Sequence, residues 1–169
     1  MMRKPLLAIA LLMLSQVSLG QAAIFQDNLL TIPQTAVVDP DNPAYFEDVQ
    51  LSYDGDGKFT VVAARSSTLV AVDSVMIAIL ESFPLQLSVS VSGHKSVPCV
   101  ELQAPVITRK GNTFTVMLAE TQLGPAESCI AMIDPFETSF AVDILGLSAG
   151  SYTVSVNGVE AEFVLAADN

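Results

Sequence analysis

Residues 152–163 read YTVSVNGVEAEF, and this stretch decides the fold class. Asn157-Gly158 is the strongest short signal for a two-residue β-hairpin turn, because both residues tolerate the positive φ that the turn needs. The turn pairs Val156 with Val159, Val154 with Ala161, and Tyr152 with Phe163. The serine, threonine and glutamate residues between them fall on the opposite face. The stretch therefore predicts an antiparallel hairpin with one apolar and one polar face.

Two earlier hairpins are predicted by the same test of register. The first turns through residues 54–58, and the second through residues 109–111, where a glycine suits the left-handed position of a three-residue loop. The expected pairs are Tyr53 with Phe59, Leu51 with Val61, Val49 with Ala63, Val106 with Phe114, Ala104 with Val116, and Leu102 with Leu118. Ser52 and Thr60 fall on the polar face of the first hairpin.

Three further strands are expected at residues 74–80, 85–91 and 138–145. Residues 72–83 also fit an amphipathic helix. Pro84 and the strict alternation of apolar residues that follows it favour two successive strands instead. About seven strands then lie after residue 72, at the spacing typical of a sandwich.

The chain is therefore predicted to be all-β, with two structural regions. Residues 67–169 are expected to form an immunoglobulin-like antiparallel β-sandwich of about seven strands. Residues 24–66 form a β-hairpin extension or a small module before it. The run of small polar residues at 66–68 marks the expected boundary.

Residues 1–23 have the order of a secretory signal peptide. Arg3 and Lys4 precede an apolar run at residues 6–14, and small residues end the segment at Ala22 and Ala23. The apolar run is too short to span a bilayer. We expect export to the periplasm or the cell exterior, with no membrane association after cleavage.

The chain is strongly acidic, with a net charge of −11 at pH 7. Signal cleavage removes two basic residues and leaves five against 18 acidic ones, a net charge of −13. Such a surface repels nucleic acid and anionic lipid, so neither is expected as a partner.

Cys99 and Cys129 are the two cysteines of the chain. In an oxidising compartment such a pair is most simply one disulfide. Two thiols and the single histidine cannot complete a structural zinc shell. We therefore predict a disulfide, with no metal site and no cofactor.

The carboxylates of Asp54 and Asp56 alternate with glycines, as at the start of a calcium-binding loop. Lys58 and Arg65 stand where an EF-hand needs further ligands. An Asp/Gly hairpin turn is therefore favoured, and weak calcium binding at this loop stays open. Residues 39–41 are likewise expected to form a turn.

No catalytic residue is predicted. His94 is expected in a loop that leaves a strand, and no nucleophile motif accompanies it. Glu101 and Glu120 flank the second hairpin but project from opposite faces in the chosen register, which excludes them as a glycosidase pair. Tyr152, two residues after Gly150, is typical of a structural tyrosine corner.

Several ordered motifs between residues 74 and 166 resemble an uncharacterised family of secreted bacterial domains. They are LESFPLQL at 80–87, VSG at 91–93, PC at 98–99, TRKGNTFTV at 108–116, PFE at 135–137, AGSYTV at 149–154 and VNG at 156–158. The resemblance implies an immunoglobulin-like sandwich bridged by Cys99 and Cys129, with no activity. Family members often carry an acidic residue before the first cysteine. Pro98 stands there in this chain, so the position supports no metal site.

The N-terminal region has a resemblance of its own. The segments LTIP at 30–33 and YFEDVQL at 45–51 resemble a short β module of secreted bacterial proteins.

Export, a sandwich fold and the missing chemistries predict a non-catalytic binding or structural module. Its partner is expected to be a protein, contacted through a sheet face, a loop or an exposed edge strand. The alternatives are a small-ligand carrier, an enzyme with an unfamiliar carboxylate site, and an inhibitor that presents a loop to a secreted protease.

Overall fold

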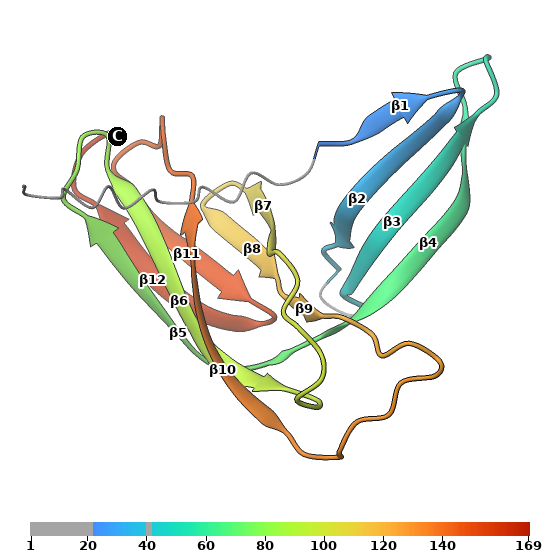
Figure 1. Cartoon of the computed structure of the whole chain (residues 1–169). Helices are drawn as coiled ribbons and strands as arrows, with labels where there is room; N and C mark the ends of the chain where they lie inside the picture. The colour runs from blue at the N-terminus through green and yellow to red at the C-terminus, as the bar shows by residue number, and fades with distance from the viewer. Residues whose placement is uncertain (1–21, 40–41) are drawn as a thin grey trace, which may run out of the picture.

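The structure, a computed structural model, describes residues 22–39 and 42–169, and their regular structure is entirely β (Figure 1). The strands are β1 (Ile24–Gln26), β2 (Leu29–Val37), β3 (Ala44–Tyr53), β4 (Phe59–Leu69), β5 (Ala71–Leu80), β6 (Gln86–Lys95), β7 (Val106–Lys110), β8 (Thr113–Met117), β9 (Ala119–Glu120), β10 (Asp134–Val142), β11 (Gly150–Val156) and β12 (Val159–Leu165). The predicted all-β class is confirmed. Among these residues there is no helix long and apolar enough to cross a membrane. Most of the predicted signal peptide, residues 1–21, lies outside the described residues, as do residues 40–41 of the predicted turn at 39–41.

A β-sandwich forms the C-terminal part of the chain. One sheet has the order β10-β6-β5 and the other β12-β11-β8-β7, with β8 and β11 parallel. Alternate residues of the strands point inward and meet in one core. Its buried members include Leu87, Val89, Val91, Phe114, Val116, Val154, Val156 and Leu165. Each such side chain stabilises the fold by about 1.5–3 kcal/mol when it leaves water.

The first four strands form a single-layered sheet that projects from the sandwich as a separate arm (Figure 1). Its order is β1-β2-β3-β4, and the end of β4 pairs antiparallel with the two-residue strand β9 of the sandwich region, which is the fifth strand of this sheet. Thr68 pairs with Glu120 there, and Leu69 with Ala119. The predicted boundary at residues 66–68 thus lies inside β4, and the chain enters the sandwich through the buried Val70.

The hairpin of β11 and β12 is confirmed in every predicted pair. Val156 faces Val159, Val154 faces Ala161, and Tyr152 faces Phe163. Asn157 and Gly158 have φ values of 47° and 92°, as the two-residue turn requires.

The first predicted hairpin is confirmed near its turn and wrong farther away. Tyr53 faces Phe59 and Leu51 faces Val61, as expected, but Ala63 pairs with Gln50 and not with Val49. The register shifts twice between Glu47 and Leu51. Asp48 has a φ of 48° in this irregular segment, and aspartate tolerates that conformation better than most residues. A β-bulge therefore ends the simple alternation.

The second predicted hairpin has the right strands and the wrong register. Its turn is the two-residue Gly111-Asn112, so Arg109 pairs with Phe114 and Ile107 with Val116. The expected pairs Val106–Phe114, Ala104–Val116 and Leu102–Leu118 do not form. The prediction sought one apolar face, but the end of β8 is buried on both faces: Val116 points into the sandwich core, and Met117 packs under the N-terminal sheet.

The expected strands at 74–80 and 85–91 are confirmed as β5 and β6, and the helical alternative for residues 72–83 is wrong. The third expected strand is β10, which begins at Asp134 rather than at residue 138. Pro135 argued against a strand at its true start, because proline cannot donate a ladder hydrogen bond. A proline is tolerated there because β10 is an edge strand.

Candidate binding cleft between the two sheets

Tyr45 of β3 anchors the N-terminal sheet on the sandwich. Its side chain is fully buried, and its hydroxyl donates a 2.9 Å hydrogen bond to the carbonyl oxygen of Ala104. The ring packs with Met117 and Ala119, and partly buried neighbours complete this small core: Ala36, Leu69 and Val106. Burial, and secondarily the carboxylate of Glu47, raises the pKa of Tyr45 to about 12. The phenol is therefore neutral at physiological pH.

A second contact fixes which face of the N-terminal sheet looks toward the sandwich. The side chain of Gln34 on β2 donates a 3.4 Å hydrogen bond to Gln103. Gln34 pairs with Glu47, two residues from Tyr45, so both contacts come from one face of the sheet.

Farther from the junction, the same face is apolar and exposed. One row of paired residues crosses all four strands, Phe25–Leu30–Leu51–Val61, and the next row is Tyr53–Phe59. We call these six residues the distal patch. Phe25, Phe59 and Val61 are 55%, 49% and 60% exposed. The rings of Tyr53 and Phe59 lie 5.0 Å apart between centroids. A sheet with one apolar face is normally covered by a second layer, and the described residues supply none.

The outer face of the sheet β12-β11-β8-β7 is polar and regular. Two rows of paired residues cross its four strands: Glu160–Ser155–Thr115–Thr108 and Glu162–Thr153–Thr113–Lys110. Hydroxyl groups thus occupy the middle of each row. At the β12 end of the rows stand the carboxylates of Glu160 and Glu162. At the β7 end, one row has Thr108 and the other has the ammonium group of Lys110.

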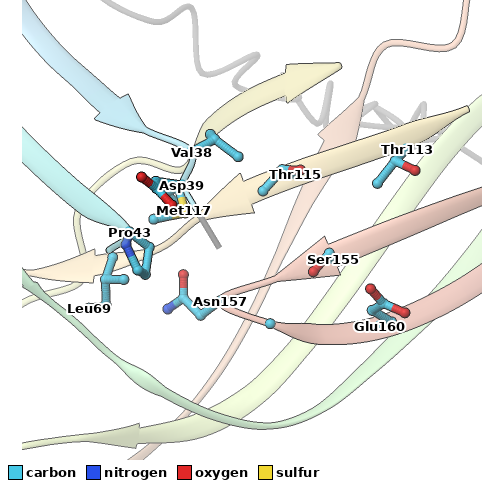
Figure 2. A pocket seen from close by; sticks show the side chains of 11 residues that line it. Val38, Asp39, Pro43, Leu69, Thr113, Thr115, Met117, Ser155, Asn157 and Glu160 are labelled. Carbon is cyan, nitrogen blue, oxygen red and sulfur yellow. The ribbon is translucent and has the colours of Figure 1, made fainter. Parts of the chain in front are cut away.

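The polar face meets the base of the N-terminal sheet in a cleft, shown in Figure 2, and no residue of the distal patch lines this cleft. The polar strands form its floor, and Val38, Asp39, Pro43 and Leu69 close its inner end. This part has a volume of about 400 Å³. A second, more open hollow continues from it between Ala36 and the threonines of β7 and β8. The cleft therefore offers hydroxyl groups, the carboxylates of Asp39 and Glu160 and the cationic groups of Arg109 and Lys110 beside an apolar wall. Among the described residues there is no group of three or more possible metal ligands.

The predicted disulfide is present, between Cys99 and Cys129 with a Cα–Cα distance of 6.0 Å. It lies outside the cleft lining and ties the segment after β6 to the segment before β10. Asp54 and Asp56 form the expected turn, in which the Asp54 carboxylate accepts hydrogen bonds from the backbone N–H groups of Asp56 and Lys58 at 2.7 and 3.1 Å.

The other residues considered for catalysis, His94, Glu101 and Glu120, do not form a common site. His94 lies within β6 and not in the expected loop, with its Nδ1 3.3 Å from the Asp73 carboxylate. Glu101 is exposed, whereas Glu120 is buried and pairs with Leu102, not with Val100.

Tyr152 is a tyrosine corner, as predicted. Its hydroxyl donates a 2.8 Å hydrogen bond to the carbonyl of Ser148, and its ring stacks on Phe163 at 5.3 Å.

Two features of the structure were not predicted from the sequence. The buried carboxylate of Glu120 accepts hydrogen bonds from the backbone N–H of Ser96, at 2.9 Å, and from the Ser96 hydroxyl. The junction at Tyr45 depends on contacts 59 residues apart along the chain, which no local pattern signals.

Comparisons with known proteins concern mainly the sandwich. Residues 89–165, from within β6 to the end of β12, match the sequence model of the ORF11 beta-sandwich domain. The chain is also 33% identical over 90 residues to an uncharacterized 10.2 kDa protein in the HgiCIIM 5′ region of Herpetosiphon aurantiacus, a match that covers 52% of this chain and 92% of that protein. No solved structure matches the chain.

Proposed function

This chain belongs to the ORF11 beta-sandwich domain family, and we propose that it is an exported, non-catalytic module that binds another protein. The observation that carries the proposal is the distal patch. It places two phenylalanines and a valine in water on a sheet that lacks a covering layer. Contiguous apolar surface of this kind marks protein interaction sites, and aromatic residues are the usual anchors of such interfaces.

Export is part of the proposal. The segment 1–23 has the order of a signal peptide, and the Cys99–Cys129 disulfide suits an oxidising compartment such as the periplasm or the cell exterior.

The finer assignment of the sandwich as immunoglobulin-like also belongs to the proposal. It is supported by the tyrosine corner at Tyr152 and by the disulfide.

The test is photo-cross-linking in the native cells. A photoreactive amino acid at Val61 reports on the distal patch, and the same probe at Thr60 reports on the opposite face of β4. We expect one protein to be cross-linked from position 61 and not from position 60. The purified protein should then bind the mature chain, and Phe59→Ser should weaken that binding at least tenfold. Equal cross-linking from both positions, or binding that Phe59→Ser leaves intact, would contradict the proposal.

A second candidate function is protease inhibition, favoured by one exposed segment. Ile130, Met132 and Ile133 are more than half exposed, directly after the disulfide-bonded Cys129. A tethered apolar loop of this kind can present itself to the substrate groove of a protease. Inhibition of a secreted protease at near-equimolar ratio, lost on Ile130→Asp and kept on Phe59→Ser, would favour this function over the first.

A further inference from the structure

We infer that the cleft is a binding site for a neutral saccharide, which lies as a short oligosaccharide across the polar strands. The site is separate from the distal patch, so this inference goes beyond the proposed function. Three observations carry it: the kinds of hydrogen-bonding group along the cleft, the balance of its charges, and the apolar wall beside them.

The hydrogen-bonding groups change in kind along the cleft. At β12 the carboxylate of Glu160 can only accept hydrogen bonds. On β8 and β11 the hydroxyl groups of Thr113, Thr115 and Ser155 both donate and accept. At β7 the ammonium group of Lys110 can only donate. A guest that satisfies all three kinds must itself donate and accept along its whole length, as the hydroxyl groups of a sugar do.

The central groups of the floor are open to a guest. Ser155 pairs with both Glu160 and Thr115, so these three residues are neighbours in one row, about 4.8 Å apart from strand to strand. Within the part of the chain that the structure describes, none of their three side chains hydrogen-bonds another residue. Figure 2 shows them on the strands of the floor. Asn157 differs, because its side chain already bonds the backbone of distant strands.

The charges of the lining favour a guest without net charge. The inner part of the cleft has the carboxylates of Asp39 and Glu160, and the more open hollow has the cationic side chains of Arg109 and Lys110. The carboxylates repel a phosphorylated or other anionic guest, and the cations repel a polyamine. Neutral hydroxyl groups gain from both parts, because hydrogen bonds to a charged group are stronger than those between neutral groups.

The apolar wall favours a sugar ring over a linear polyol. Val38, Pro43 and Leu69 stand beside the polar floor. A pyranose ring carries hydroxyl groups around its rim and C–H groups on its faces, so it can bond the floor while one face packs on this wall. The volume of about 400 Å³ lies in the range of small-molecule sites. Three steps between neighbouring strands, about 14 Å, separate β12 from β7, so the floor is long enough for a short oligosaccharide.

The test titrates cellotriose, a neutral trisaccharide, into the full mature chain labelled with nitrogen-15, and follows the amide chemical shifts by NMR. Three control probes carry charges: a glucosamine trimer is cationic, a galacturonate trimer is anionic, and trialanine is a zwitterionic peptide. The double variant Thr115→Val/Ser155→Ala removes two hydroxyl groups from the row. Its matched control, Thr35→Val/Ser88→Ala, removes them from a half-buried threonine and a half-buried serine outside the cleft lining.

We expect cellotriose to shift the amide signals of β8 and β11, and to bind at least fivefold more tightly than each charged probe. Thr115→Val/Ser155→Ala should weaken binding at least fivefold, which corresponds to the loss of one or two hydrogen bonds. Glu160→Ala changes an exposed residue and should weaken binding about threefold, so it tests the same site if the double variant does not fold. The matched control should change the affinity less than twofold.

The inference is overturned if cellotriose causes no shifts, if a charged probe binds as tightly, or if the two double variants have equal effects. Phe59→Ser should leave the affinity for cellotriose unchanged, and its loss in that variant would place the sugar on the distal patch instead of in the cleft. The proposed function fails separately, when the partner found by cross-linking binds Phe59→Ser as well as it binds the unchanged chain.

Discussion

The hydroxyl of Tyr45 donates a 2.9 Å hydrogen bond to the carbonyl of Ala104, across 59 positions of sequence. This bond, with the burial of the ring against Met117 and Ala119, holds the N-terminal sheet at the angle that forms the cleft. The position of the distal patch relative to the sandwich therefore depends on a contact at the base of the N-terminal sheet, away from the patch itself.

Removing this hydroxyl should loosen the junction without unfolding the sandwich. Tyr45→Phe keeps the ring and leaves the half-buried carbonyl of Ala104 without this partner, at a cost of about 1 kcal/mol. We expect a lower urea midpoint and faster hydrogen exchange in β3 and β4, with exchange in β11 and β12 unchanged. An equal acceleration in all four strands would show that the two parts unfold as one unit.

The raised pKa of Tyr45 predicts a loss of stability in alkali. A phenol with a pKa of about 12 in the folded chain and about 10 in the unfolded chain keeps its proton more tightly when folded. Its contribution is complete below pH 10 and is lost as the pH rises from 10 to 12, by roughly 2–3 kcal/mol. Urea unfolding at pH 9 and pH 11.5 measures this loss, which Tyr45→Phe should reduce. An identical pH dependence in the variant would exclude Tyr45 as its source.

Asn157 is expected to be the most sensitive turn residue. Its side chain donates to the carbonyls of Val70 and Leu118, at 2.9 and 2.7 Å, and accepts from the N–H of Leu118 at 2.9 Å. Asn157→Ala loses these bonds and places alanine at positive φ, which should cost about 3 kcal/mol.

Asn157→Gly is the matched control, because it loses the same bonds and relieves the backbone. It should be about 1 kcal/mol more stable than Asn157→Ala in thermal unfolding. If the two variants melt together, the backbone conformation contributes nothing measurable.

Glu120 is expected to stabilise the segment between β6 and the first cysteine. Glu120→Gln keeps the shape but turns one acceptor into a donor facing the N–H or the hydroxyl of Ser96, at a cost of about 1–3 kcal/mol. Ser96→Ala removes the hydroxyl alone and should cost less. A double-mutant cycle in urea should give a coupling energy above 0.5 kcal/mol, and additive effects would mean that the two side chains act independently.

The sequence predicts what local signals determine and misses what distant segments impose. Asn157-Gly158 specifies its own turn and register, so that hairpin was predicted in full. Met117 is buried under the N-terminal sheet, so both faces at the end of β8 are apolar. Because this burial depends on a distant segment, the register predicted for the hairpin of β7 and β8 was wrong.

The polar floor of the cleft and the distal patch were each predictable only in part. The polar face at Ser155 and Glu160 and the apolar pairs Leu51–Val61 and Tyr53–Phe59 were both expected from alternation. The threonines of β8 join the polar rows because β8 pairs in parallel with β11. No local sequence pattern indicates this pairing. Nor does it indicate that the apolar face of the N-terminal sheet lacks a second layer.

The central claim is that the distal patch binds a protein, and the most direct measurement is the affinity of the cross-linked partner for single-residue variants. Phe59→Ser removes one aromatic anchor from the patch, while Thr60→Ala changes the neighbouring residue on the opposite face. Calorimetry should show at least tenfold weaker binding for Phe59→Ser and a change of less than twofold for Thr60→Ala. Equal affinities for the two variants and the unchanged chain would contradict the claim.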